Sequence, residues 1–194
     1  MTTIIPIQRL SANARDAFLA HLLTLGPEDV RLRFGTPLSA AAITAYVDRI
    51  DFDVDAIFAV HGDALALAGA AHLAFGSDLA ELGVSVLPQA RGRGIGYALV
   101  ARAAEHARNR STPRLYMHCL AENATMIRIA RRAGMAVVIE AGDADAHVAL
   151  PPATPLSVTS EMISDRVALF DYALKSNVET WRRMGLAMNE RPRQ

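Results

Sequence analysis

The chain has 194 residues, of which 52% are apolar, and its 20 Lys and Arg balance its 20 Asp and Glu. That apolar content offsets the entropy of ordering the chain, which excludes intrinsic disorder, and the length suits one domain with a small appendage. A single cysteine excludes an internal disulfide framework. No run approaches the roughly 18 apolar residues of a membrane span, and the start lacks a leader-like segment. We therefore expect a cytoplasmic protein.

The first third of the chain alternates short strands with helices. We predict a strand at 4–10, a helix from an N-cap at Ser11 to about Leu25, a short charged turn or helix at 27–35, and a helix from an N-cap at Ser39 to about Ile50. Two strands follow at 56–60 and 64–74, and the residues between them suit a tight hairpin turn.

The next part of the chain predicts further strands and two helices. In order they are a strand at 80–87, a glycine-rich turn, a helix at 94–108, a strand at 114–120, a helix at 124–133, and a hairpin of strands 137–140 and 147–150 around a turn at 141–144. We expect residues 1–150 to form one domain.

Three prolines, Pro151, Pro152 and Pro155, make a stiff break, so we treat residues 151–194 as a separate segment with an amphipathic helix at 158–188. Apolar residues recur in this helix at steps of three or four: Ile163, Val167, Phe170, Leu174, Val178 and Trp181. Such a stripe has to be covered, either by the first domain or by a second copy of the chain in a homodimer.

Basic residues concentrate in the middle of the chain. Between residues 88 and 134 there are nine arginines and two acids, so this window carries +7 and the remainder carries −7. A basic block in a neutral protein predicts a polyanionic ligand held at one place, and not general attraction to nucleic acid or membrane. The alternative is that several of these arginines lie on solvated helix faces.

The most informative segment is the end of the strand at 80–87 and the turn after it. Pro88 has no N–H and ends ladder hydrogen bonding. Three glycines follow at the mouth of a helix: Gly92, Gly94 and Gly96. Without Cβ atoms the backbone bends tightly there, and its free N–H groups and the helix dipole favour a phosphate. Arg91 and Arg93 add positive charge at the rim, so the segment predicts a phosphorylated cofactor.

Two common phosphate loops do not fit this turn. A Walker loop needs Gly-Lys-Ser or Gly-Lys-Thr after its last glycine, and the turn has neither. A dinucleotide fingerprint needs G-x-G-x-x-G with an acid about 20 residues further on, whereas this turn reads G-x-G-x-G and lies behind several predicted strands. A dinucleotide-dependent enzyme therefore remains only an alternative.

The turn resembles the cofactor-binding motif of the GNAT superfamily of acyl-CoA-dependent N-acetyltransferases, Arg/Gln-x-x-Gly-x-Gly/Ala at the start of a helix after an apolar strand. Residues 91–96 fit this pattern in full, and residues 84–88 give the usual lead-in. Family members also commonly carry an Asn followed eleven and twelve residues later by Gly and Phe, and here Asn123 precedes Gly134 and Met135 at that spacing. The resemblance implies an α+β fold: a mixed, mostly antiparallel sheet flanked by helices, here with a C-terminal helical extension.

The resemblance implies acetyl-CoA as the cosubstrate, with its pyrophosphate at the amides of residues 91–96 and its pantetheine arm on the edge of the preceding strand. The implied cofactor-binding residues are Val84, Val86, Leu87, Arg91, Gly92, Arg93, Gly94, Ile95, Gly96 and Asn123. An amide near Val86 would face the thioester oxygen, where charge grows during attack. Asn123 also has a purely structural interpretation, as the N-cap of the helix that follows it.

A carboxylate in the cofactor strand and a missing hydroxyl define the expected chemistry. Glu81 lies where superfamily members often place a general base. An equal interpretation is that its carboxylate faces solvent or only binds the substrate. Many members protonate the leaving thiolate with a Tyr seven residues after the Asn, and here that position is Ala130. By its location His118 is the first substitute, against its interpretation as a structural histidine. The less favoured substitutes are Cys119, Tyr97 and Tyr116.

We therefore predict an N-acetyltransferase that moves an acetyl group from acetyl-CoA to a primary amine, on a small molecule or a protein lysine, by direct attack in a ternary complex and without a metal. The acidic residues between positions 28 and 55 suit a cationic acceptor, although solvated loops explain them equally well. The alternative in another class is a regulatory module that binds acyl-CoA without turnover, because Ala130 lacks the hydroxyl.

Overall fold

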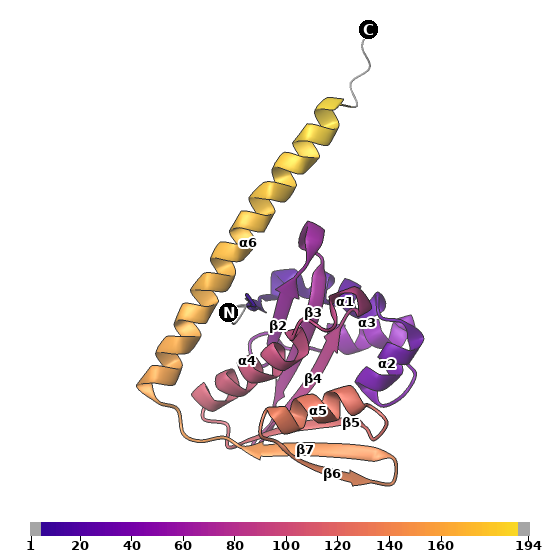
Figure 1. Ribbon diagram of the computed structural model, residues 1–194, viewed down its shortest axis with the longest axis vertical. Helices are drawn as coiled ribbons and strands as arrows, with labels where there is room; N and C mark the ends of the chain where they lie inside the picture. The colour runs from indigo at the N-terminus through magenta and orange to yellow at the C-terminus, as the bar shows by residue number, and fades with distance from the viewer. Residues whose placement is uncertain (1–4, 190–194) are drawn as a thin grey trace.

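The computed structural model describes residues 5–189, and only the backbone of Asp63 and of residues 178–189. Within this range seven strands form one sheet in the order β1-β2-β3-β4-β5-β7-β6, in which neighbours are antiparallel except for the parallel pair β4 and β5 (Figure 1). The strands are β1 (Gln8–Leu10), β2 (Ala56–His61), β3 (Leu67–Phe75), β4 (Ala80–Val86), β5 (Arg114–Leu120), β6 (Ala136–Glu140) and β7 (Asp143–Ala149). The helices are α1 (Arg15–Leu23), α2 (Pro27–Phe34), α3 (Ala40–Asp48), α4 (Ile95–Asn109), α5 (Ala124–Arg132) and α6 (Pro155–Asn189).

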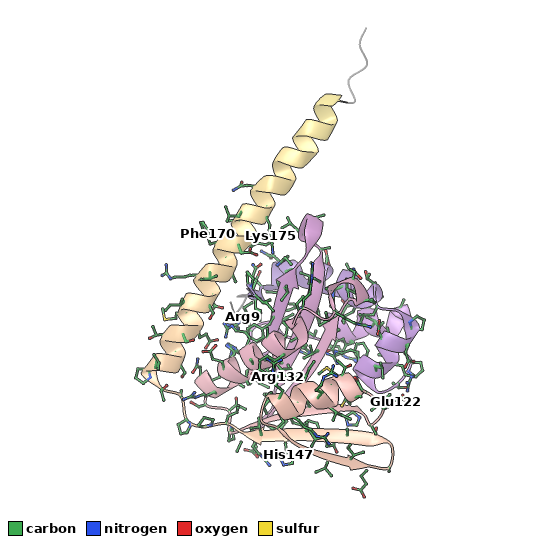
Figure 2. The ribbon with its side chains drawn as sticks, in the orientation of Figure 1. Arg9, Glu122, Arg132, His147, Phe170 and Lys175 are labelled. Carbon is green, nitrogen blue, oxygen red and sulfur yellow. The ribbon has the colours of Figure 1, made fainter. Side chains whose placement is uncertain are left out.

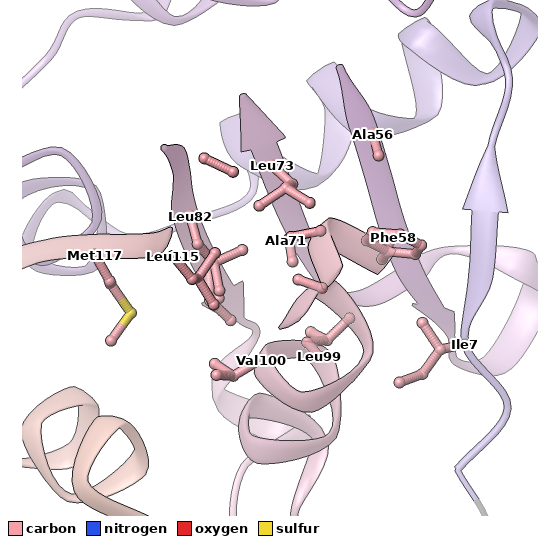
Figure 3. Close-up of a cluster of buried hydrophobic side chains, with 14 of the residues drawn as sticks. Ile7, Ala56, Phe58, Ala71, Leu73, Leu82, Leu99, Val100, Leu115 and Met117 are labelled. Atoms are coloured by element: carbon pink, nitrogen blue, oxygen red, sulfur yellow. The ribbon is translucent and has the colours of Figure 1, made fainter. Parts of the chain in front are cut away.

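Helices cover both faces of the sheet because its central strands carry apolar side chains on both sides. On β2, Phe58 lies in the cluster beneath α4, whereas its neighbours Ile57 and Ala59 lie in the cluster formed with α1, α2 and α3. Figure 3 shows the first of these clusters, in which Leu99 and Val100 of α4 face the side chains of the strands. Removal of these side chains from water is the main favourable term of folding.

The N-terminal elements differ slightly from their predicted bounds. Ser39 caps α3 as predicted, since its Oγ accepts the Ala42 N–H at 3.2 Å. Ser11 makes no capping hydrogen bond and precedes a short 3-10 turn at Ala12–Ala14, so α1 begins later than expected. The first strand is limited to β1, and residue 4 of the predicted strand lies outside the described residues.

The loop between β2 and β3, at residues 62–66, is longer than the predicted tight turn, whereas the turn between β6 and β7 is shorter than predicted. β3 begins at Leu67 and not at residue 64, because Ala64 has a φ of 53° within a 3-10 turn. Ala141 and Gly142, with φ values of 51° and 97°, form the whole connection between β6 and β7. Positive φ at both central positions gives a turn whose twist matches the strands, and β7 therefore begins at residue 143 instead of 147.

The second half of α6 extends away from the domain, and its first half lies beside α4 (Figure 1). Arg102 of α4 makes ion pairs with Glu161 (2.9 Å) and Asp165 (2.6 Å), and the Tyr172 ring lies 4.9 Å from the His61 ring. The described side chains of the apolar stripe are between 43% and 68% exposed: Ile163, Val167, Phe170 and Leu174. The side chains of Val178 and Trp181 lie outside the described residues. No helix within residues 5–189 is long and apolar enough to cross a membrane.

The predicted α+β architecture, a mostly antiparallel mixed sheet flanked by helices with a C-terminal helical extension, is confirmed. The doubly wound parallel sheet that a dinucleotide-dependent enzyme of this type requires is contradicted, since β4 and β5 are the parallel pair in the described sheet.

Candidate active site

β4 and β5 separate after a short parallel contact. They pair at Ala80 with Leu115 and at Glu81 with Tyr116, and no further pairing joins them within the described residues. β3, in contrast, pairs with β4 from one end to the other. The edge of β4 that faces β5 is therefore open beyond Leu82, and a cavity of about 490 Å³ lies along it.

Four elements bound the cavity: β4, the turn into α4, α5 and α2. The predicted cofactor-binding residues that line it are Val84, Val86, Arg91, Gly92, Gly94, Ile95, Gly96 and Asn123. Arg93 is exposed and is not among the residues that line the cavity.

The main chain of β4 shows which of its groups face the cavity. The Leu87 N–H donates to the carbonyl oxygen of Ala68, on the β3 side, at 2.9 Å. Because main-chain groups alternate along an antiparallel pair, those of Val84 and Val86 point to the opposite, open edge. Arg91 marks this edge, since its Nε donates to the Val86 carbonyl at 3.1 Å. Leu87 faces away from a cofactor at this edge, with its amide bonded in the sheet and its side chain buried, which corrects the expectation for this residue.

The glycine turn brings free amides to the other end of the cavity. Gly92 and Gly94 have φ values of 75° and 81°, a region that glycine adopts without strain. Gly94 is the N-cap of α4, so the amides of the first helical turn have no acceptor within the helix. A Cβ at Gly96 would lie 3.0 Å from Ile129 Cδ1, so a glycine here lets α4 approach α5 closely. Unpaired amides at the positive end of a helix dipole form an anion site.

Arginines of the basic block lie at this anion site, although most of the block lies elsewhere. Arg91, Arg128 and Arg132 line the cavity. The Arg132 guanidinium lies 4.2 Å from the centroid of the Tyr97 ring and so bridges α5 and the first turn of α4 (Figure 2). Arg131 is exposed on α5, as the alternative interpretation expects, whereas Arg102 is buried in ion pairs with α6 and fits neither interpretation.

Ion pairs hold α2 across the cavity. Asp29 accepts from Arg91 at 2.6 Å. Arg31 bonds both Glu28 on its own helix, at 2.7 Å, and Glu122 in the loop before α5 (Figure 2). These hydrogen bonds raise the pKa of Arg31, and the bond from Arg31 lowers the pKa of Glu28. Glu28 and Asp29, two of the acids expected to attract a cationic acceptor, are thus neutralised by arginines.

Asn123 caps α5, which is one of its two predicted roles, and also lines the cavity. Its Oδ1 accepts the Met126 N–H at 3.1 Å and caps α5. Its Nδ2 makes no hydrogen bond to the residues between 5 and 189 and is left to donate to a ligand in the cavity that Asn123 lines. At the other end of α5, Gly134 has a φ of 81° and Met135 is buried in the cluster beneath α4.

Neither predicted catalytic side chain lines the cavity. Glu81 and His118 are exposed on the face of the sheet that α2 covers in part. His118 Nδ1 lies 3.0 Å from Asp145 Oδ1, and its Nε2 lies 3.5 Å from Asp143 Oδ1. The Tyr116 hydroxyl donates to Asp145 at 2.5 Å, which raises the pKa of Tyr116 to about 12 and, with the bond from His118, lowers the pKa of Asp145. Tyr116 is therefore a poor proton donor.

The other candidates for the missing acid differ in their placement. Cys119 is unsuited, because it is 4% exposed and burial raises the pKa of its thiol, whereas Tyr97 lines the cavity. Ala130 is fully buried. Among residues 5–189, no group of three or more His, Cys, Asp or Glu is arranged to hold a metal ion.

A polar pair that the sequence did not predict lies at the inner wall of the cavity. Ser85 lines the cavity, and its Oγ lies 2.8 Å from the Nε2 of His21 on α1. The two residues are 64 positions apart, and no pattern in either segment predicts that they come into contact. The one available signal was a serine within an apolar strand.

A second polar group was also missed, on the face of β3 and β4 that α2 and α3 cover. The Tyr46 hydroxyl lies 2.6 Å from His72 Nδ1, and His72 Nε2 lies 3.0 Å from Asp55 Oδ2. Burial lowers the pKa of His72, and its hydrogen bond to Asp55 opposes this change. Arg33 donates to Tyr46 at 3.3 Å and covers Gly83, so this group fixes Arg33 at the cavity wall.

Solved structures with this fold are numerous and share little sequence with the chain. The GNAT domain of S. lividans PAT is 21% identical with a TM-score of 0.63, over 74% of this chain and 89% of that one. Spermidine N-acetyltransferase from Vibrio cholerae, in complex with CoA and spermine, is 17% identical with a TM-score of 0.60, over 75% and 96%. Ribosomal-protein-alanine N-acetyltransferase from Brucella melitensis is 21% identical with a TM-score of 0.56, over 74% and 99%. At these identities the likeness establishes the fold.

The sequence itself matches a family model. A search of curated proteins gave no match. The model of the acetyltransferase (GNAT) family matches residues 33–135, more than half of the chain, and this match includes β4, the glycine turn, α4, β5 and α5. With the separated strands and the glycine turn in place, the chain belongs to the GNAT family of acetyltransferases.

Proposed function

We propose that this protein transfers an acetyl group from acetyl-CoA to a cationic primary amine by direct attack in a ternary complex. The observation that carries the proposal is the open edge of β4, which continues into the amides at the start of α4 along one cavity. Strand edge and helix N-terminus together suit a ligand with a polar arm and a diphosphate.

The residues around the cavity fit this acyl donor. The amides of the first turn of α4 suit the diphosphate, and Arg128 and Arg132 suit its further phosphate. The main chain of Val84 and Val86 suits the amides of the pantetheine arm. Arg91 occupies the Val86 carbonyl in this structure, so an arm that bonds to this carbonyl replaces Arg91 there. When bound, acetyl-CoA supplies the activated acetyl group.

Carboxylates near the point of strand separation support a cationic acceptor. Glu81, Asp143 and Asp145 are exposed, and hydrogen bonds from Tyr116 and His118 keep Asp145 ionised by lowering its pKa. A polyamine and a protein lysine both present the ammonium that these carboxylates attract. The neighbour crystallised with CoA and spermine shows that this fold can accommodate such a ligand in another protein.

A catalytically silent acyl-CoA-binding module is the second candidate. It is favoured by one observation, the buried Ala130 at the position where many family members carry a tyrosine hydroxyl. This candidate predicts that acetyl-CoA binds and is not consumed.

Release of free CoA separates the two candidates. With acetyl-CoA and a panel of polyamines and lysine peptides, we expect acceptor-dependent CoA release that falls about 10-fold or more in Glu81→Gln, because a positioned base contributes about 10²–10⁴-fold. Glu140→Gln, an exposed carboxylate at the end of β6, is the matched control. Binding of acetyl-CoA without CoA release from any acceptor would establish the silent module, and an unchanged pH–rate profile in Glu81→Gln would exclude Glu81 as the base.

We also propose that α6 pairs with the α6 of a second copy. Its apolar stripe follows steps of seven, four, three and four residues: Leu156, Ile163, Val167, Phe170 and Leu174. That spacing is typical of a coiled-coil seam. Phe170 lies on the opposite side of α6 from Lys175, which contacts the domain through the His61 carbonyl (Figure 2). Arg166 and Asp171 flank the stripe five residues apart, the offset of an ion pair between parallel helices.

A further inference from the structure

Ser85 and His21 are arranged as a hydroxyl and a base. The Ser85 Oγ lies 2.8 Å from His21 Nε2, and His21 Nδ1 lies 2.9 Å from the carbonyl oxygen of Leu67. A carbonyl oxygen can only accept, so Nδ1 carries the proton of the neutral ring and Nε2 is left as an acceptor. The Ser85 hydroxyl therefore donates to His21, whose tautomer and orientation Leu67 fixes. A hydroxyl bonded to an oriented base is the arrangement that moves protons in many enzymes.

The surroundings of His21 keep its ring neutral. The residue is 3% exposed, and burial lowers the pKa of its imidazole below the ordinary 6.5. The bond to the Leu67 carbonyl opposes this change, and the positive charge of Arg33 on α2 adds to it. A ring that is neutral and bonded at Nδ1 can take up a proton at Nε2 alone.

Ser85 lies at the place where the proposed acyl donor would present its thioester. It stands between Val84 and Val86, whose main chain faces the open edge, and it lines the same cavity. The layer around it is apolar, since Ala70 and Leu87 belong to the cluster beneath α1. An alanine would fill this position without the cost of burying a hydroxyl against a histidine, so packing does not account for the pair.

We propose that Ser85 and His21 carry the proton that acetyl transfer releases, an inference that rests on the proposed function. The acceptor ammonium first gives one proton to Glu81, which passes it to water, and the neutral amine then attacks. As the C–N bond forms, the amine nitrogen gives its second proton to Ser85 Oγ while the Ser85 hydroxyl proton passes to His21 Nε2. As the C–S bond breaks, His21 returns a proton through Ser85 to the sulfur of CoA. The products are the N-acetylated amine and CoA thiol, and both side chains end in their starting states. The pair thus supplies the acid that Ala130 cannot.

In this scheme Ser85 is the catalytic residue, and His21 is a positioning residue that acts through it. Ser85→Ala should lower kcat about 100-fold and leave the KM for acetyl-CoA within about two-fold, because the loss falls on proton transfer and not on binding. Ser85→Thr keeps the hydroxyl and should recover most of this loss. Ser77→Ala, a serine exposed in the β3–β4 loop, is the matched control and should behave as wild type.

The pH profile separates a relay from a structural serine. Wild-type kcat should fall on the acid side of pH 6.5, where His21 becomes protonated and can no longer accept, and this limb should be absent from Ser85→Ala. A second readout does not depend on turnover. Nitrogen NMR of the imidazole in the free protein should show a neutral His21 protonated at Nδ1, and the Nε2 resonance should shift in Ser85→Ala.

The outcomes separate the two levels of the proposal. A wild type that releases no CoA from any acceptor overturns the proposed function and the relay with it. Acceptor-dependent CoA release that is unchanged in Ser85→Ala, or a His21 ring protonated at Nε2 in the free protein, overturns the relay alone.

Discussion

Two glycines in the strands beside the cavity, Gly69 and Gly83, differ in the atoms that occupy the space a side chain would need. A Cβ at Gly69 would lie 2.8 Å from Ile95 Cγ2 and 3.3 Å from the Ser85 carbonyl oxygen, so it meets the core and the backbone of β4. A Cβ at Gly83 would lie 2.1–2.2 Å from the guanidinium of Arg33, the mobile end of a long side chain. The two positions look alike in sequence, yet one is bounded by groups that cannot move and the other by one that can.

We therefore predict that the alanine variants differ in stability. Gly69→Ala should lower the free energy of unfolding by about 1–3 kcal/mol, the usual cost of overpacking a core. Gly83→Ala should cost less than about 1 kcal/mol, because Arg33 can swing away, although it then loses its bond to Tyr46. Urea denaturation of both variants measures these values. Equal losses, or a larger loss for Gly83→Ala, would contradict the assignment of Arg33 as the neighbour that yields.

At the residue scale, the sequence predicts what depends on local pattern and not what depends on distant partners. The glycine motif and its neighbours could be placed at one cavity because they lie within one short segment. Leu87 was assigned to the wrong edge because an alternating pattern does not say which edge of a strand is paired. The Ser85–His21 pair could not be predicted at all, since α1 must first fold onto the sheet.

At the scale of elements, a polar network joins α6 to α4. Arg102 is 5% exposed and donates to Glu161 and Asp165, and Glu161 also accepts from His106 (2.5 Å) and Asn109 (2.6 Å). Burial by itself would raise the pKa of Glu161, but these hydrogen bonds outweigh it and lower that pKa to about 2. A buried arginine with paired carboxylates is costly to separate, so this network fixes where α6 docks.

The network predicts how docking responds to acid. Because the pKa of Glu161 is about 2 in the folded state and 4.5 in the unfolded state, its contribution to stability is complete above pH 4.5 and is lost as the pH falls toward 2. The protection factors of the amides of residues 157–168, which are exchange rates corrected for the intrinsic effect of pH, should therefore fall over this range. In Glu161→Gln these protection factors should be lower at neutral pH and nearly independent of pH below 4.5, while Glu140→Gln should follow wild type. Acid-resistant docking of α6 in the wild type would contradict this account.

The position of α6 shows what periodicity reveals about an element. The pattern correctly predicts a long helix with an apolar stripe. It does not predict that α6 contacts the domain through another face, on which Glu161 and Asp165 form ion pairs and Ala168 is buried, because the stripe counts only regularly spaced apolar residues. The stripe itself stays exposed in the described residues, as Phe170 at 68% illustrates.

At the scale of the whole molecule, charge is distributed less simply than the sequence indicates. Three of the nine arginines in the basic block line the cavity, Arg91, Arg128 and Arg132. Others hold the structure together, as Arg102 does at α6 and Arg108 does at the Pro152 carbonyl. The net charge of a sequence window therefore indicates the region of the site. Only the fold shows which arginines of the basic block face the cavity.

The exposed stripe of α6 makes a prediction about assembly. The proposed helix pair implies that the protein has twice the chain mass in solution and that Ile163→Glu with Phe170→Glu converts it to a single chain, since charges in a coiled-coil seam are not tolerated. The matched control is Leu169→Glu, an exposed apolar residue of α6 outside the stripe. Light scattering measures the mass. A wild type with the mass of one chain would exclude the pair.

Calorimetric titration with acetyl-CoA tests the central claim, that the amides around Gly94 bind the diphosphate of the acyl donor. Gly94→Glu places bulk and negative charge at this site and should abolish binding. Gly142→Glu is the matched control, because Gly142 also has a positive φ, with open space around it, in the distant β6–β7 turn, and it should bind as wild type does. Unchanged affinity in Gly94→Glu would contradict the account.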